Sequence, residues 1–295
     1  MIKLHPQFQQ LINLFFLLIV GKYVAHIYLT WKAIIGILFF TFLIEHLFYY
    51  IRNKTLDFIS FSSLSTAIGV MLMMVTTHYT IYLTLLFFAL FQKQFLHYNA
   101  RHFFNPSNFA LILGLLLFYN DAHIVLGQLG HEVWLIWAVS IVALAILYRV
   151  DRWVLSFSFV LFYLFFQYIM IVNSDPVIIM ENIYHRFYSV SFVIFILFML
   201  TDPKTTPTKL WHQVSFAMTI AFLTTFLDYM YGFRVQHLFL VLFFCSPWVV
   251  FLEEYSHTLD KKALIVVSFT VIILALSAII YIQMQPPYYF EMDGQ

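Results

Sequence analysis

The segments Phe104-Asn105-Pro106-Ser107-Asn108 and Thr201-Asp202-Pro203-Lys204-Thr205-Thr206-Pro207 place polar residues beside prolines in an otherwise apolar chain. The first segment opens one apolar run and the second closes a later one. Polar residues at helix ends inside a membrane are costly unless they bind something or satisfy exposed backbone groups. The two segments therefore predict broken helices and are the first place to look for a binding site.

The composition is that of a membrane protein. Hydrophobic residues make up 63% of the chain and charged residues only 10%, with a mean hydropathy of +0.88. A soluble core does not need so much apolar surface, so we expect the lipid bilayer as the surroundings. The net charge of +1 gives no reason to expect nucleic acid as a partner.

Apolar stretches of membrane-spanning length recur along the chain, at about 17–25 residues per span. They predict an all-α, polytopic transmembrane bundle of about ten or eleven helices, forming a single integral membrane domain over residues 1–295. The predicted spans are 11–30, 33–50, 57–75, 78–95, 105–119, 133–148, 153–173, 187–201, 212–231, 235–252 and 263–283.

Lysine and arginine predict the orientation, because cytoplasmic loops carry an excess of them. With the N-terminus in the cytoplasm, eleven of these residues fall inside and three outside, and Lys22 lies within the first helix. The inner set is Lys3, Arg52, Lys54, Lys93, Arg101, Arg149, Arg152, Lys204, Lys209, Lys261 and Lys262; the outer set is Lys32, Arg186 and Arg234. We expect a bacterial inner-membrane protein with a cytoplasmic N-terminus and, with eleven helices, an outer C-terminus.

The two motifs have a physical interpretation of their own. Pro106 at the start of a helix costs no hydrogen bond, which makes Asn105 the N-cap and leaves free amides that suit an electronegative group. In the second motif Asp202 ends a helix and Lys204 brings a cation. Their corresponding positions in two halves fit an internal two-fold repeat with broken helices around a shared site. Simple capping of the two helix ends is the alternative.

The same motifs resemble signatures of a known membrane family. Asn105-Pro106 lies in a segment similar to the "FNPA" signature of the NqrB/RnfD family, which are membrane components of the sodium-pumping NADH:quinone oxidoreductase and of the Rnf complex. Phe198 to Pro207 resembles the family's "FMATDPVTSP". Glu45 with Arg52, and Ser63 to Gly69, resemble weaker family features in the expected order. The resemblance covers about residues 45–247 and is nearest to short, stand-alone RnfD-like relatives.

The resemblance implies a fold similar to that of urea and ammonium channels and a bound redox group. A non-covalent flavin, either FMN or riboflavin, or a quinone would be bound by residues matching the motifs. Those residues are Ser65, Thr66, Arg101, His102, Asn105, Pro106, Asn108, Asp202, Lys204, Thr205 and Thr206.

The chain departs from the family between the motifs. Flavinylated members carry "GSxGETS", whose threonine holds FMN through a phosphoester, whereas this chain has Gly127, Gly130, His131 and Glu132 there. Glutamate has no hydroxyl to phosphorylate, so covalent FMN at this position is excluded. His131 and Glu132, with His185, are outer-side candidates for metal binding or proton transfer, and capping of the sixth helix is an equal alternative.

Three functions remain open. The first is a membrane redox component that binds a flavin or quinone and exchanges electrons with a partner protein, with ion movement as an additional role. The partner is implied because the chain has no thiolate cluster and no dinucleotide-binding glycine motif. The second is a channel or transporter for a small polar solute or ion. The third is a metal-dependent lipid enzyme built on His131, Glu132 and His185, although no ligand spacing typical of a metal site supports it.

Overall fold

The computed structural model describes residues 6–24, 27–55, 61–98, 101–125, 133–149, 151–173, 183, 186–187 and 189–254. These residues are mostly helical, as the sequence predicts, with four short strands that it does not predict. The predicted span 263–283 lies outside the described residues. The elements are α1 Pro6–Tyr23, α2 Trp31–Asn53, α3 Ser62–Met73, β1 Met74–Thr76, α4 Tyr79–Phe95, β2 His97–Tyr98, β3 Arg101–His102, α5 Pro106–Leu117, β4 Ala122–Ile124, α6 Val133–Arg149, α7 Trp153–Asn173, α9 Val190–Ile194, the π-helix η2 Phe195–Met199, α10 Leu210–Tyr231 and α11 Gln236–Glu254.

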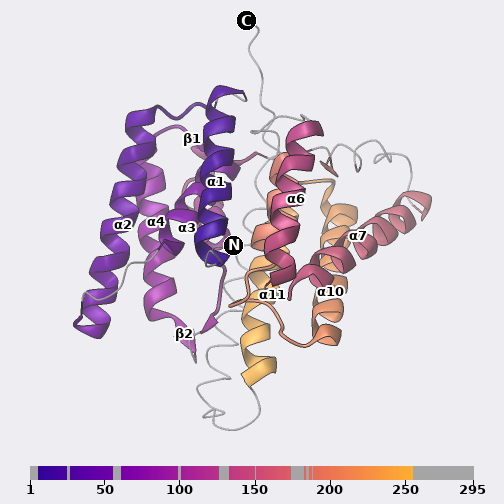
Figure 1. The fold of residues 1–295 in the computed structure, drawn as a ribbon. Helices are drawn as coiled ribbons and strands as arrows, with labels where there is room; N and C mark the ends of the chain where they lie inside the picture. Colours follow the sequence, from indigo (N-terminus) through magenta and orange to yellow (C-terminus); the bar gives the residue numbers. More distant parts are fainter. Residues whose placement is uncertain are drawn as a thin grey trace, which may run out of the picture.

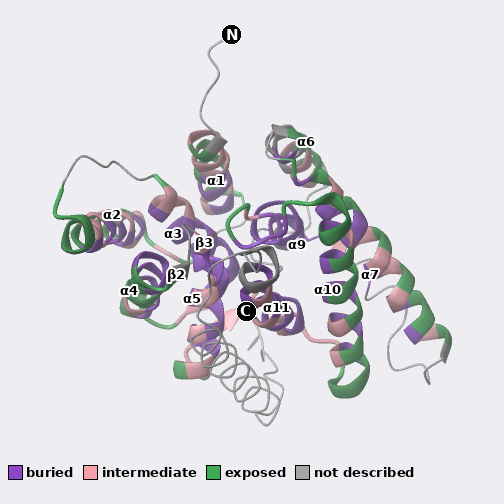
Figure 2. Cartoon of the chain, turned by 90° about the horizontal axis from the view of Figure 1, so that it is seen from below, coloured by how far each residue is buried: buried purple, intermediate pink, exposed green. Residues whose placement is uncertain are grey.

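The helices form two groups that meet at a central set of elements. Helices α1 to α5 lie on one side of the molecule, and α6, α7, α10 and α11 lie on the other (Figure 1). Viewed from below, α3, α5, α9 and α11 occupy the middle, with α2 and α4 at one edge and α7 and α10 at the opposite edge (Figure 2). The short helices α3, α5 and α9 are therefore central, together with α11.

Three of the described helices are long and apolar enough to cross a membrane: Trp31–Asn53, Trp153–Val172 and Leu210–Tyr231. Helix α2 shows why. Its inward stripe, from Ile34 to Phe48, is buried at helical spacing, while Phe39 and Leu43 on other faces are exposed. A helix that is apolar on its exposed side as well as its buried side is typical of a lipid environment.

Two antiparallel two-stranded ribbons flank the short helices: one follows α3 and α5, and the other precedes α5. Strand β1 follows α3 directly and pairs with β4, which follows α5, so that Val75 lies opposite His123. Strands β2 and β3 pair just before α5, with His97 opposite His102. The pairing of β1 with β4 satisfies backbone hydrogen-bonding groups where α3 and α5 stop.

Candidate functional site

The two polar motifs are in direct contact, although 97 positions separate them. Asn105 Nδ2 donates a hydrogen bond of 3.1 Å to Asp202 Oδ2. The same Asn105 side chain caps α5, since its Oδ1 accepts from the Asn108 backbone N–H at 3.1 Å, and Pro106 occupies the first turn. One side chain therefore both starts α5 and fixes the position of the second motif against it.

The second motif directly follows an irregular helix end. η2 is wound as a π-helix, with the Leu200 backbone N–H bonded to the Phe195 carbonyl at 2.8 Å. After it, Asp202 organises the turn: its Oδ1 accepts from the Lys204 backbone N–H at 3.0 Å, and its carbonyl accepts from Thr206 Oγ1 at 2.7 Å. π-helical turns occur frequently at functional sites.

A cavity of about 160 Å³ lies where these elements meet. The first turns of α3 and α5 contribute its polar wall, with Ser62, Ser65, Thr66, Asn105 and Ser107. The opposite wall comes from α1, α6, α9 and η2. Its apolar residues are Leu14, Leu147, Ile194, Leu197, Phe198 and Met199, and α1 also contributes Gln7 and Gln10. Two helix N-termini at one cavity present backbone N–H groups and positive dipole ends to whatever binds there.

Helices α3 and α5 approach each other closely beside the cavity. Gly69 lines the cavity, and a Cβ added to it would lie 3.2 Å from Ser107 Oγ. Ser107 Oγ in turn donates to the Thr66 carbonyl at 3.3 Å. The absence of a side chain at Gly69 thus brings the two helix starts together.

Lys93, at the start of the segment that contains the first motif, is a cation of the site that is not among the predicted cofactor-binding residues. Its side chain is 6% exposed and lines the cavity, and its Nζ donates to Glu45 Oε1 at 2.8 Å and to Ser62 Oγ at 3.0 Å. Gln94 Nε2 also donates to Glu45 Oε1 at 2.8 Å. Among the described residues nothing else accepts from Lys93, which leaves one of its three ammonium N–H groups for a ligand.

The pKa values of Asp202 and Lys204 are both shifted in the direction that favours the neutral form. Burial raises the pKa of the Asp202 carboxyl, and the Lys204 N–H, the charges of Lys204 and Lys93 and the Asn105 amide oppose this rise. Part of the Asp202 residue still faces the cavity. Burial lowers the pKa of the Lys204 ammonium, with the charge of Lys93 acting in the same direction and Asp202 and Glu45 against it.

The sequence-predicted residues divide into those that line the cavity and those that support it. Ser65, Thr66, His102, Asn105, Pro106, Asp202 and Lys204 line it. Four others point elsewhere: Arg101 Nη1 donates to the Thr206 carbonyl at 3.4 Å, Asn108 Nδ2 donates to the Phe239 carbonyl at 3.1 Å, and the Thr205 and Thr206 hydroxyls donate to the Asp202 carbonyl. These four hold the loop and α11 in place.

The outer-side candidates Gly127, Gly130, His131, Glu132 and His185 lie outside the described residues. Within the part of the chain that is described, no group of three or more His, Cys, Asp or Glu side chains is placed to hold a metal ion.

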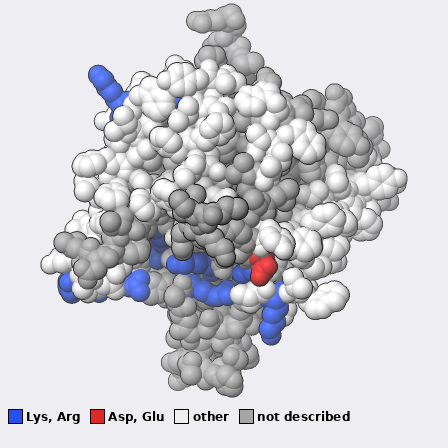
Figure 3. Space-filling model, viewed as in Figure 1, with Lys and Arg blue, Asp and Glu red and all other residues white. Residues whose placement is uncertain are grey.

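Positive charge gathers on the cavity side of the molecule. In Figure 3 most of the visible Lys and Arg lie in a band across the lower part, with acidic atoms beside it. Basic atoms also appear at the upper left, and the broad surface between them is without charge. Arg52 Nη1 donates to the Gln94 carbonyl at 3.2 Å, and Arg152 Nε donates to Thr206 Oγ1 at 3.1 Å. The uncharged surface above the band fits lipid contact, and the band fits the side predicted to face the cytoplasm.

Neither a scan of protein-family models nor a search of curated proteins gives a match to this chain.

Proposed function

We propose that this protein is a membrane redox component that holds a quinone head group in the cavity between its two motifs and exchanges electrons with a partner protein. The observation that carries the proposal is the cavity itself, with two helix N-termini and Lys93 on one wall and mainly apolar side chains on the other. A quinone presents that combination, namely electronegative carbonyl oxygens on an apolar ring.

The cavity volume favours a quinone over a flavin. An engineered cavity of about 150 Å³ holds benzene, so about 160 Å³ accommodates one six-membered ring. Drug-sized ligands occupy about 300–1,000 Å³, and a three-ring isoalloxazine would have to extend through the cavity mouth. The flavin expected from the family resemblance is therefore the less favoured ligand of the two.

The chemistry of reduction suits these residues. Reduction of a quinone places negative charge on its oxygens, and donors fixed before the reaction stabilise such charge best. The third N–H of Lys93, the first amides of α3 and the Ser107 N–H of α5 would supply these donors. The Asn108 N–H is already bonded to Asn105 Oδ1, and Pro106 has no N–H. Glu45 and Ser62 hold the Lys93 ammonium in place from behind. Electrons would come from or go to a partner, for which the basic band offers a docking face.

An internal two-fold repeat around a central site is part of this proposal. Helices α2 and α7 both begin with tryptophan, and the fifteenth residue of each, Glu45 and Gln167, bonds to the end of the helix packed against it. In the first half that partner helix is α4, followed by α5; in the second it is α10, followed by α11. The central places of α3, α5, α9 and α11 in Figure 2 fit a two-fold relation between the halves.

Calorimetric titration of the purified protein with a short-chain ubiquinone tests the proposal. Asn105→Ala removes a cap that also lines the cavity, whereas Thr30→Ala removes the cap of α2, where Thr30 Oγ1 accepts from Ala33 N at 3.3 Å away from the cavity. Each change costs about 1 kcal/mol of helix stability. We expect Asn105→Ala alone to weaken quinone binding about tenfold or more. Equal affinity in both variants would contradict the proposal.

Two further measurements identify the ligand class. A flavin spectrum in the purified protein would favour flavin over quinone. Lys204→Ala should weaken binding of a neutral quinone only slightly but binding of FMN strongly, because lysine acts on phosphate mainly as a point charge.

A channel or transporter for a small polar solute or ion is the second candidate. The small volume and the serine, threonine and amide groups of the cavity favour it. A protein without absorbing cofactor, without quinone affinity and with solute uptake in proteoliposomes would support transport instead.

A further inference from the structure

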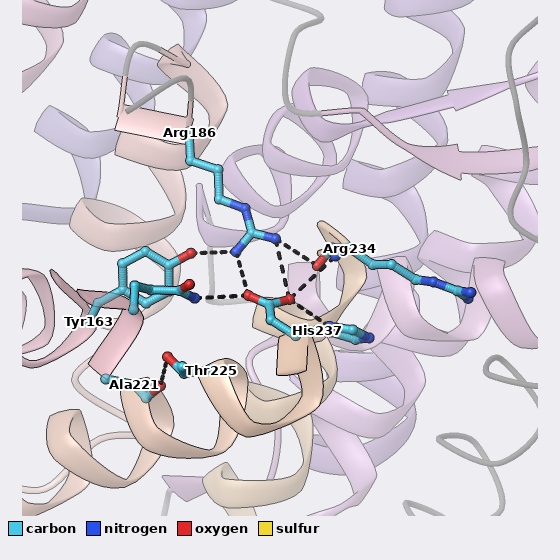
Figure 4. A network of polar contacts seen from close by, with 8 residues as sticks. Tyr163, Arg186, Ala221, Thr225, Arg234 and His237 are labelled. Carbon is cyan, nitrogen blue, oxygen red and sulfur yellow. Dashed lines mark hydrogen bonds and ion pairs between the residues drawn. The ribbon is translucent and has the colours of Figure 1, made fainter. Parts of the chain in front are cut away.

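A second polar cluster lies in the other half of the chain. Asp228 on α10 accepts hydrogen bonds from Gln167 Nε2 at 3.0 Å, Arg186 Nη1 at 3.1 Å and His237 Nδ1 at 2.7 Å, and from the Arg234 backbone N–H at 3.3 Å. Figure 4 shows these groups converging on one carboxylate. The Asp228 and His237 side chains are fully buried, and that of Arg186 is 3% exposed.

The cluster and the cavity lie at opposite ends of α10. Asp202 to Lys204 line the cavity, and they precede Leu210, the first residue of α10. Asp228 lies eighteen residues after Leu210, which is about 27 Å along the axis at about 1.5 Å per residue. A ligand in the cavity and a group bound at the cluster would therefore be reached from opposite faces of the molecule.

One carboxylate in this cluster is shared by two basic groups of different kinds. Arg186 is always charged, whereas histidine changes charge in the physiological range. Asp228 Oδ1 accepts from His237, from the Arg234 N–H and, at 3.5 Å, from Arg186 Nη2. A carboxylate has about four acceptor sites in all, so the long contact to Arg186 is the one that yields first.

Three buried polar atoms at the cluster have no partner among the described residues. They are Arg186 Nε, Gln167 Oε1 and the Oγ1 of Thr224, which lies one helical turn before Asp228. Such atoms are rare and costly in a finished core. Their concentration around Asp228 fits a cluster with a second arrangement of its hydrogen bonds.

We propose that Asp228 and His237 form a proton-binding site whose occupancy is opposed by Arg186. Uptake of one proton from water converts the His237 imidazole to an imidazolium, and no covalent bond other than the new N–H changes. The cluster charge rises from zero to plus one, so Asp228 neutralises His237 and its contact with Arg186 weakens. Arg186 keeps the Tyr163 hydroxyl, the Arg234 carbonyl at 2.9 Å and the Phe233 ring.

The described elements packed around the cluster contribute few other charged or titratable groups. α7 contributes Tyr163, and the turn before α11 contributes Arg234. α5, α9 and η2 bring no charged residue, and β3 brings Arg101 and His102 on the cavity side. The turn Phe233–Gln236, directly before His237, is partly exposed.

Hydrogen exchange followed by mass spectrometry tests the site without any cavity ligand. Exchange in residues 232–240, corrected for intrinsic rates, is compared at about pH 5 and about pH 8. We expect it to be about tenfold faster at the acid end, which corresponds to about 1.4 kcal/mol in the opening free energy. His237→Gln should abolish this difference, and His78→Gln, at an exposed position before α4, should retain it.

Wild-type exchange that does not change with pH would overturn the proposal, whether or not His237→Gln folds. A difference that survives in folded His237→Gln would also overturn it, because another group would then take the proton. Neither result bears on the quinone titration, so the proton-binding site and the quinone site are tested independently.

Discussion

The pair of Lys93 and Glu45 allows the role of the cavity to be separated from the stability of the fold. The side chains are 6% and 1% exposed, and 2.8 Å separates Lys93 Nζ from Glu45 Oε1. Removing one partner of such a pair leaves an uncompensated buried charge and costs about 3–5 kcal/mol, whereas replacing both by apolar residues is often neutral or stabilising. Lys93→Met and Glu45→Leu should each destabilise the protein, and the double variant should recover.

The single variants should lower the unfolding temperature in detergent by of the order of 10 °C. The double variant should lie near the wild type, and so should Lys209→Met, which removes an exposed lysine outside the cavity. Titration with a short-chain ubiquinone then gives the functional result. Because Lys93 supplies the free N–H, the double variant should be stable yet bind the quinone at least about tenfold more weakly.

Two outcomes would refute this reasoning. Wild-type quinone affinity in the stable double variant would show that Lys93 does not contact the ligand. A Lys93→Met protein as stable as Lys209→Met would show that the buried pair does not behave as its geometry requires.

Four other predictions follow from the sequence and the site. Cysteine at position 204 should be labelled only from the cytoplasm and cysteine at Glu181 only from outside; the reverse pattern would invert the orientation. A denaturing gel should show no fluorescent flavin band, because Glu132 stands where the family that the chain resembles has its acceptor threonine. Gly69→Val should displace Ser107 and fill the cavity, so quinone binding should be lost in a protein that still folds, as judged by gel filtration. Burial raises the Asp202 pKa above its ordinary 3.8, so its stability contribution is complete below that pH and lost as pH rises through the folded-state value. Asp202→Asn should remove this loss in thermal unfolding measured against pH, and it should also abolish quinone binding.

The helices could be predicted because each is a separate apolar run. The predicted stretch 105–119 contains α5, and 212–231 contains almost all of α10. The strands could not be predicted, since β1 and β4 are only three residues each and pair across the interval from Met74 to Ile124. Nothing in local periodicity reports a hydrogen-bond partner that distant. The predicted span 57–75 likewise merges α3 with β1, because both are apolar.

Site residues could be predicted where their role depends on the neighbouring sequence, and could not be predicted where it depends on contacts with distant helices. Asn105 and Asp202 stand out because a polar residue beside proline at a helix end has a known role. Arg101 and Asn108 belong to the same motif, but their side chains face the second motif's loop and α11. Lys93 lies in the last turn of an apolar helix, and this charge was the available signal. Its partner Glu45 is 48 positions away, so their pairing needed the structure.

Stability alone gives no reason for the two buried ionic clusters. Apolar replacements of similar size would pack at least as well as Lys93 with Glu45, or as Arg186 with Asp228, since desolvation of both ions offsets most of their attraction. Each cluster, however, contains a polar group with a further possible interaction, which an apolar replacement would remove. Lys93 keeps one N–H beside a cavity, and Asp228 is shared between a permanent cation and a titratable ring. Under the two proposals, the redox ligand would bind at one end of α10 and a proton at the other, about 27 Å apart along the helix axis.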